Sequence, residues 1–89
     1  MSEPRLRLRQ SDLFWREIDG QVFALDGRTW DYLNLNESGR MLWDQLVGGA
    51  TRSQLVQSLV GTYGIDPAVA ESDVGAFVEM LYEKKLLDE

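Results

Sequence analysis

The chain has 89 residues, 44% of them hydrophobic, and a formal net charge of −6, which together indicate one globular domain rather than a disordered chain. It contains no cysteine and no histidine, so the sequence offers no disulfide, no ordinary zinc site and no histidine-based catalysis. No apolar stretch approaches the roughly 18 residues that span a membrane, and the charged first ten residues do not resemble a signal peptide. We therefore expect a cytoplasmic protein that is not an enzyme and has no metal or cofactor.

A short cationic segment comes first. Arginines alternate with leucines over residues 5–9. We expect residues 1–12 to form an N-terminal arm, in which residues 5–9 are a short cationic arm or strand with a solvated edge, ahead of a domain formed by residues 13–89.

Three strands are expected next. Residues typical of strands fill 13–18 and 21–25, and the Asp-Gly dipeptide between them favours a tight hairpin. A second Asp-Gly turn leads to a third strand, residues 30–35, whose side chains alternate between two faces. The pattern predicts an antiparallel meander in which the third strand lies at an edge.

Three helices follow the strands. Asn36 is a good N-cap for the first, Thr51 and Gln54 form a capping box for the second, and Asp66 with Pro67 opens the third. Their expected ranges are 37–47, 52–63 and 67–85. Leu86 and Leu87 are expected to pack back on the sheet.

The elements predict an α+β fold that is winged helix-turn-helix-like, with a three-stranded antiparallel sheet followed by three helices. Many proteins of this shape bind DNA. Here, however, the third helix carries four carboxylates that would be repelled by phosphates. They are Glu71, Asp73, Glu79 and Glu83. A DNA-binding transcription regulator is therefore the alternative function rather than the preferred one.

The edge of the third strand has little protection against pairing with another chain. Charged side chains and proline normally block such pairing, but residues 30–35 contain only one charged residue and no proline. Either the third helix or a second copy covers this edge, or an extended peptide adds to it as a fourth strand. In the second case Val74, Phe77 and Leu81 would line a groove, although an apolar stripe at helical spacing more often packs into the core.

Several short motifs together resemble the PqqD-like family of leader-peptide-binding domains, the RiPP recognition elements (RiPPs are ribosomally synthesised, post-translationally modified peptides). The motifs are Leu25-Asp26, Tyr32, Leu35-Asn36-Glu37-Ser38-Gly39, Trp43, Asp73-Val74, Phe77, Leu81 and Leu86-Leu87. The resemblance covers about residues 13–87 and is greatest to the freestanding proteins of lasso-peptide biosynthesis, with pyrroloquinoline quinone or another pathway as alternatives. It differs at two positions where the family commonly has glycine, which are occupied by Trp30 and Lys85 here.

The resemblance implies non-catalytic binding of the leader of a precursor peptide, by β-strand addition to the third strand against the third helix. Leu33 and its neighbours would supply main-chain hydrogen bonds. The implied partners are the precursor peptide and a leader peptidase or other modifying enzyme, with no nucleic acid or membrane, and the chain is expected to be a monomer or weak dimer. A structural subunit that docks on an enzyme and binds no peptide is a third possibility. The implied peptide-binding residues are Trp30, Tyr32, Leu33, Asn34, Asp73, Val74, Phe77 and Leu81.

Overall fold

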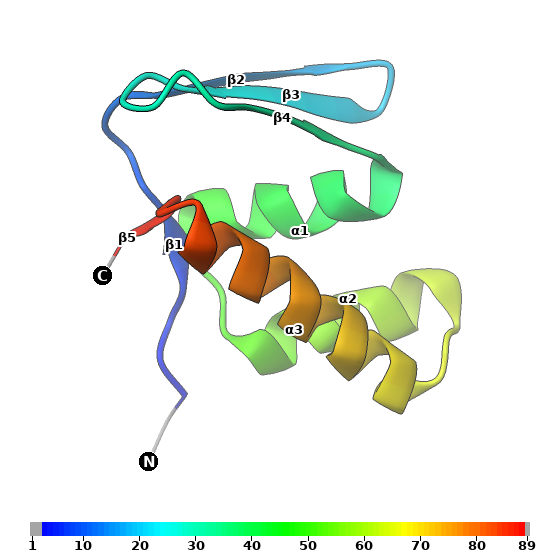
Figure 1. Cartoon of the computed structure of the whole chain (residues 1–89). Coiled ribbons are helices and arrows are strands. Elements are labelled where there is room, and N and C mark those ends of the chain that lie inside the picture. The colour runs from blue at the N-terminus through cyan, green and yellow to red at the C-terminus, as the bar shows by residue number, and fades with distance from the viewer. Residues whose placement is uncertain (1–2, 89) are drawn as a thin grey trace.

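The computed structural model describes residues 3–88 and has two layers, a small sheet above and three helices below (Figure 1). The sheet comprises β2 (Leu13–Ile18), β3 (Gln21–Asp26) and β4 (Tyr32–Leu35), and the helices are α1 (Glu37–Gly48), α2 (Arg52–Tyr63) and α3 (Pro67–Glu83). A separate two-stranded ladder pairs β1 (Arg7–Leu8) with β5 (Leu87–Asp88). The predicted α+β fold, with three antiparallel strands followed by three helices, is confirmed.

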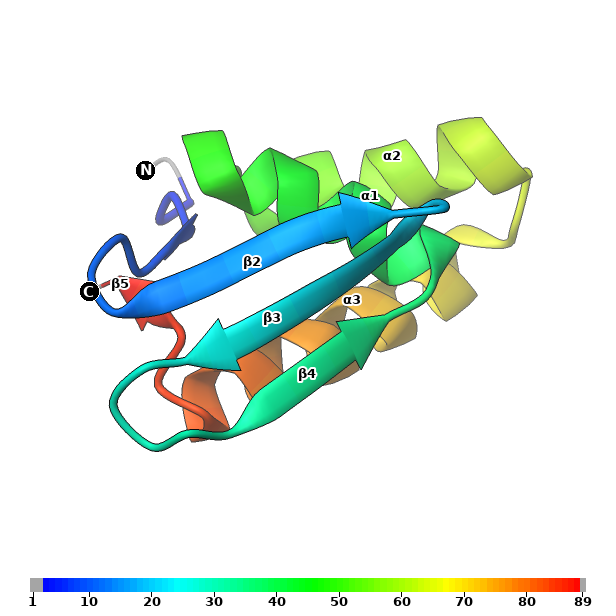
Figure 2. The same ribbon diagram turned by 90° about the horizontal axis from the view of Figure 1, so that it is seen from above.

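The three strands of the sheet pair in chain order, so β3 is central and β4 lies at an edge, as predicted. Asp19 and Gly20 form the β2–β3 turn with φ values of 53° and 78°. Two positive φ values in a two-residue loop are those of a type I′ turn, whose twist matches the strands on either side. Seen from above, the upper face of this sheet is uncovered (Figure 2). That face carries the exposed side chains of Phe14, Ile18 and Tyr32.

The lower face of the sheet packs on the helices because apolar side chains alternate along β3 and β4. Val22 of β3 and Trp43 and Leu46 of α1 are completely buried there. Burying side chains of this size stabilises the fold by about 1.5–3 kcal/mol each. The Trp43 ring also meets Trp15 edge to face, with centroids 5.9 Å apart. The sheet is therefore fixed on α1, with β4 positioned above α3 (Figure 2).

Side-chain caps set the helix starts, as the sequence predicted. The Asn36 side chain accepts a hydrogen bond from the Gly39 amide, and Thr51 and Gln54 form a reciprocal capping box. Asp66 caps α3, with proline at its first position. Within residues 3–88, none of the helices combines the length and apolar character that a membrane crossing requires.

The third helix ends at Glu83 rather than at Lys85 as predicted. Lys85 has a φ of 57°, and the Leu86 amide donates to the Leu81 carbonyl at 2.9 Å. A left-handed residue followed by this hydrogen bond is the Schellman ending of a helix. The chain therefore reverses at Lys85 and carries the following leucines back toward the core.

The strand alternative is present at Arg7–Leu8, and Arg7 is exposed, but the expectation of a solvated edge is wrong for Arg9. Leu6, Leu8 and Arg9 are buried, and Leu6 exchanges two main-chain hydrogen bonds of 2.8 Å with Ala50. The leucines of this extended segment alternate onto the face that packs on the core, whereas Arg9 is buried through its ion pair with Asp26. Leu87, expected to pack back on the sheet, is buried but pairs with Leu8 of β1 instead. Residues 1–2 of the predicted arm and residue 89 of the predicted domain lie outside the described residues.

Candidate functional site: the β4 edge and its groove

The outer edge of β4 exposes main-chain groups. The Asp26 amide donates to the Asp31 carbonyl at 2.8 Å, and the register continues with Ala24 opposite Leu33. Hydrogen-bonded and non-bonded pairs alternate in an antiparallel ladder, so Leu33 turns its N–H and C=O toward β3. Tyr32 and Asn34 therefore direct theirs away from the sheet. Within residues 3–88, no strand pairs with this side of β4.

This geometry corrects the predicted role of Leu33. Its main-chain groups face β3, so they cannot bond a fourth strand. Its neighbours Tyr32 and Asn34 offer two N–H and two C=O groups to an added strand. The Asn34 side chain stays on the sheet, where it donates to Gln21 Oε1 at 3.2 Å and to the Val22 carbonyl at 3.3 Å.

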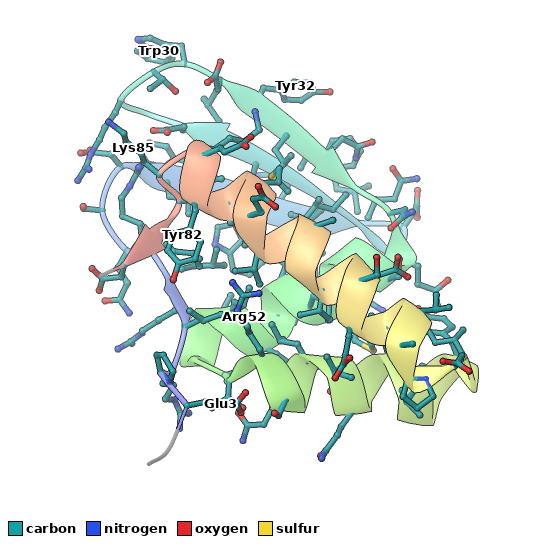
Figure 3. All side chains as sticks on the ribbon, turned by 60° about the horizontal axis from the view of Figure 1, so that its bottom comes forward. Glu3, Trp30, Tyr32, Arg52, Tyr82 and Lys85 are labelled. Atoms are coloured by element: carbon teal, nitrogen blue, oxygen red, sulfur yellow. The ribbon has the colours of Figure 1, made fainter. Side chains whose placement is uncertain are left out.

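The turn before β4 contains a bulge at Trp30. Both the Trp30 amide and the Asp31 carbonyl bond to the main chain of Asp26, and Trp30 has a φ of 66°. Trp30 and Asp31 thus lie opposite the single residue Asp26, and the first of the two is left-handed. This arrangement is a G1-type bulge. The strand consequently begins at Tyr32, not at Trp30 as predicted. Figure 3 shows Trp30 at the outer tip of the turn, apart from Tyr32, and this residue is 75% exposed.

An apolar groove lies between the end of β4, the start of α1, the end of α2 and the middle of α3. Its volume is about 670 Å³, within the usual range for ligand sites. Its floor consists of buried leucines, and its rim of half-buried or exposed larger side chains. The floor residues are Leu35, Leu42 and Leu59; the rim residues are Ile65, Tyr63 and Phe77; the polar lining is Asn34, Asn36, Glu37, Ser38, Gly39 and Asp73.

Three predicted site residues, Asn34, Asp73 and Phe77, come together in this groove. Tyr32 and Leu33 lie at the other end of β4, where they line a small pocket with Lys84. The groove thus joins the end of β4 to the middle of α3.

Val74 and Leu81 do not belong to the exposed groove. They are 1% and 0% exposed, because they lie on the face of α3 that packs into the core. The sequence showed an apolar stripe on this helix but not which of its members would reach the surface. Leu35, Leu42 and Leu59 were missed as groove residues. For Leu35 a signal was present, since it begins the Leu35–Gly39 motif noted above.

A buried ion pair supports the turn that leads into β4. Arg9 Nη2 donates to Asp26 Oδ1 at 2.6 Å, and the same oxygen accepts the Arg28 amide at 2.8 Å. The hydrogen bond from Arg9 holds the pKa of the Asp26 carboxyl below its ordinary value of 3.8. Arg9 also donates to the carbonyls of Ser11, Asp12 and Lys85. The Arg9 guanidinium therefore links the β3–β4 turn to the segment before β2 and to the end of α3.

Comparison with known proteins identifies the family. The model for coenzyme PQQ synthesis protein D (PqqD) matches residues 21–87. The chain belongs to the PqqD family. No curated protein sequence matches it.

Solved structures of PqqD-like proteins share the fold. TbiB1 in complex with the TbiA(beta) leader peptide is 26% identical over 92% of this chain and 94% of that chain, with a TM-score of 0.83. A lasso peptide synthetase B1 complexed with the leader peptide is 27% identical over 94% and 98%, with a TM-score of 0.81. The PqqD part of Methylobacterium extorquens PqqCD, described as a stand-alone RiPP recognition element, is 24% identical over 96% and 89%, with a TM-score of 0.73, and shows similarity of fold. The predicted resemblance to PqqD-like proteins, and among them to those of lasso-peptide synthetases, is confirmed.

The two departures from the PqqD family pattern now have a structural description. Trp30 and Lys85, which stand where glycine is common, are both left-handed, with φ values of 66° and 57°. Glycine adopts this region freely, whereas other residues do so at a cost. The backbone of this chain thus keeps the conformation for which glycine is suited, although larger side chains occupy both positions.

Proposed function

We propose that this protein binds the leader of a ribosomally synthesised precursor peptide and catalyses no reaction on it. The observation that carries the proposal is the free main-chain edge of β4 directly beside an apolar groove. An extended peptide needs both features, because main-chain hydrogen bonds provide affinity and pockets for alternate side chains provide selectivity. Two similar solved structures, TbiB1 and a lasso peptide synthetase B1, contain leader peptides, which supports the proposal.

In the proposed complex the leader lies antiparallel to β4. It bonds to the N–H and C=O groups of Tyr32 and Asn34, each bond contributing about 0.5–1.5 kcal/mol net. Alternate leader side chains point down into the groove, where Phe77 and Asp73 contact them. Trp30 stays a predicted contact at the tip of the turn, beyond the end of β4.

We further propose the setting in which this binding is used. The protein would present the bound precursor to a leader peptidase or another modifying enzyme of a lasso-type pathway, in the cytoplasm, as a monomer or weak dimer. A protein whose role is delivery needs an exposed binding edge but no catalytic group.

The DNA-binding alternative has no support from the described surface. The four carboxylates of α3 are exposed, so the helix would meet phosphates with negative charge. They are Glu71, Asp73, Glu79 and Glu83.

The proposal is tested at Asn34, whose main-chain N–H points to the free edge. Asn34→Pro removes that donor and places a ring in the path of an added strand, yet proline is tolerated where the N–H does not serve the sheet. Asn34→Ala is the matched control, because it removes the side chain and keeps the N–H. The leader of a precursor gene found next to the gene of this protein is titrated by calorimetry, with amide NMR to map the site.

We expect Asn34→Pro to weaken leader binding at least tenfold and Asn34→Ala to change it less than threefold, on the basis of about 1 kcal/mol per main-chain bond plus steric exclusion. Leader-induced NMR shifts should concentrate on β4 and α3. Equal affinity for the proline and alanine variants, or shifts elsewhere, would contradict strand addition at β4. Binding of the modifying enzyme without any binding of the leader would instead favour the structural-subunit alternative.

A further inference from the structure

The groove beside β4 carries charge of one sign. Of the residues that line it in the described chain, Glu37 and Asp73 are the charged ones, and both are exposed carboxylates. No described lysine or arginine pairs with either within 4.0 Å, and Arg40, which attracts Glu37 from farther away, already pairs with Glu17 and Asp44. Glu37 lies in the first turn of α1, where it offsets the positive end of the helix dipole, and Asn36 already caps this end. Asp73 has no such compensation, so the groove keeps a net negative potential.

The opposite end of β4 is different. There Tyr32 and Leu33 line a small pocket whose charged residues are Asp26, Asp31 and Lys84. Asp26 is neutralised by its ion pair with Arg9, which leaves one acid and one base. The site is therefore polarised along the strand, with an acidic end beside Asn34 and a nearly neutral end beside Tyr32. A strand bound here would encounter different charges at its two ends.

From this polarity we propose that the leader recognised by this protein carries a lysine or arginine on the N-terminal side of the segment that pairs with β4. The inference rests on the proposed function. A guest strand antiparallel to β4 has its N-terminal end beside the C-terminal end of β4, where Glu37 and Asp73 lie.

The spacing in the guest follows from strand geometry. Side chains of β4 alternate, with Leu33 and Leu35 on the lower face and Tyr32 and Asn34 on the upper. Guest residues opposite Leu33 and Leu35 point down with them, so these two alternate positions should be apolar. Continuing the alternation by two residues brings the next downward side chain level with Glu37. The expected pattern is basic–x–apolar–x–apolar, read from the guest's N-terminus.

The experiment is a peptide selection, which works without the sequence of the natural leader. A displayed library of random 12-residue peptides is selected on the immobilised full-length protein, in parallel with two variants. Glu37→Gln with Asp73→Asn removes both groove charges. The matched control, Glu79→Gln with Glu83→Gln, removes two exposed charges from α3 at positions that do not line the groove. The best peptide is then synthesised, and its site is mapped by amide NMR.

Lysine and arginine should be enriched two positions before the first apolar residue with the wild type and the control, and not with the groove variant. Replacing the basic residue of the best peptide by serine should weaken its binding about two- to fivefold, the effect of an exposed ion pair. The difference should vanish in 1 M NaCl, where the screening length is about 3 Å. A basic residue on the C-terminal side, no basic preference, or a preference unchanged in the groove variant would each overturn the inference.

The outcome also separates this inference from the proposed function. Peptides that shift the amides of Tyr32 and Asn34 but lack the basic residue would leave strand addition intact and refute the charge preference alone. Failure to enrich any peptide, or binding away from β4, would count against both.

Discussion

The Arg9–Asp26 pair provides the sharpest test of how this small domain holds its binding edge. Asp26→Asn keeps an oxygen that can accept the Arg28 amide but removes the negative charge next to the Arg9 guanidinium. The side chains of Arg9 and Asp26 are only 8% and 5% exposed, so water cannot readily replace the lost charge. The Ser11, Asp12 and Lys85 carbonyls remain as acceptors for Arg9.

These contacts set limits on the stability that Asp26→Asn should lose. Breaking a buried ion pair by neutralising one partner costs about 3–5 kcal/mol, and losing one charge-assisted hydrogen bond costs about 1.5–3 kcal/mol. Because three carbonyls still solvate the Arg9 guanidinium, we expect a loss of about 2–3 kcal/mol in the free energy of unfolding. In a domain of this size that lowers Tm by about 10–20 °C.

Urea unfolding followed by circular dichroism measures this loss, with Asp12→Asn as the control. Asp12 also faces an arginine, at 3.4 Å, but the side chains of Arg28 and Asp12 are 52% and 60% exposed. Its φ of 55° is one that asparagine tolerates, so the control should change stability by less than about 0.5 kcal/mol. A loss below 1 kcal/mol for Asp26→Asn, or equal losses for both variants, would refute the stabilising role of the buried pair.

The pH dependence follows from the lowered pKa of Asp26. The folded state holds the pKa of this carboxyl below 3.8, its ordinary value, because Arg9 donates to the carboxylate. The unfolded chain therefore takes up a proton first on acidification. The stability from this group is fully present above the unfolded pKa and is lost as the pH falls through the folded pKa. The stability difference between wild type and Asp26→Asn should accordingly be constant near neutral pH and shrink below about pH 4.

Three further predictions concern the groove, the end of α3 and the start of α2. Phe77→Ala should weaken leader binding about tenfold, measured by calorimetry, because it removes an apolar wall of the groove. Tyr82→Ala, on the same helix but outside the groove, should change the affinity less than twofold. Equal effects of the two variants would contradict the assigned site. Lys85→Gly should raise the free energy of unfolding by about 0.5–1 kcal/mol, because glycine adopts the left-handed φ of 57° without strain. A loss of stability would show instead that the aliphatic part of the Lys85 side chain makes stabilising contacts. Thr51→Ala should lower the free energy of unfolding by about 1 kcal/mol, because it removes the capping box. Thr62→Ala, near the other end of α2, should lower it by less than about 0.5 kcal/mol. Similar losses for the two variants would argue against a stabilising cap.

Local features of the chain were predictable because their causes are local. The Asp19-Gly20 turn, the Thr51 capping box and the Asp66-Pro67 helix start each depend on a few neighbouring residues. The position of β4 at the sheet edge was also predictable, since short turns force neighbouring strands to pair in order.

Other features depend on contacts between residues far apart in the sequence. An apolar stripe on α3 could be recognised, but Val74 and Leu81 are core residues and Phe77 a groove residue only because of how the helix is rotated against α2. Arg9 was expected to be solvated. It is buried because it pairs with Asp26, a contact that no local sequence pattern predicts.

The sequence by itself determined the order of elements, the turn and helix starts, and the family motifs, all of which follow from propensity and short-range hydrogen bonding. Only the tertiary structure decided that Tyr32 and Asn34, not Leu33, direct their main-chain groups outward, because that depends on which pairs of the β3–β4 ladder are hydrogen-bonded. It also decided that Glu37 and Asp73 share one groove, since packing brings together carboxylates from two different helices. The charge of that groove, and hence the kind of peptide it would accept, is a property of the fold.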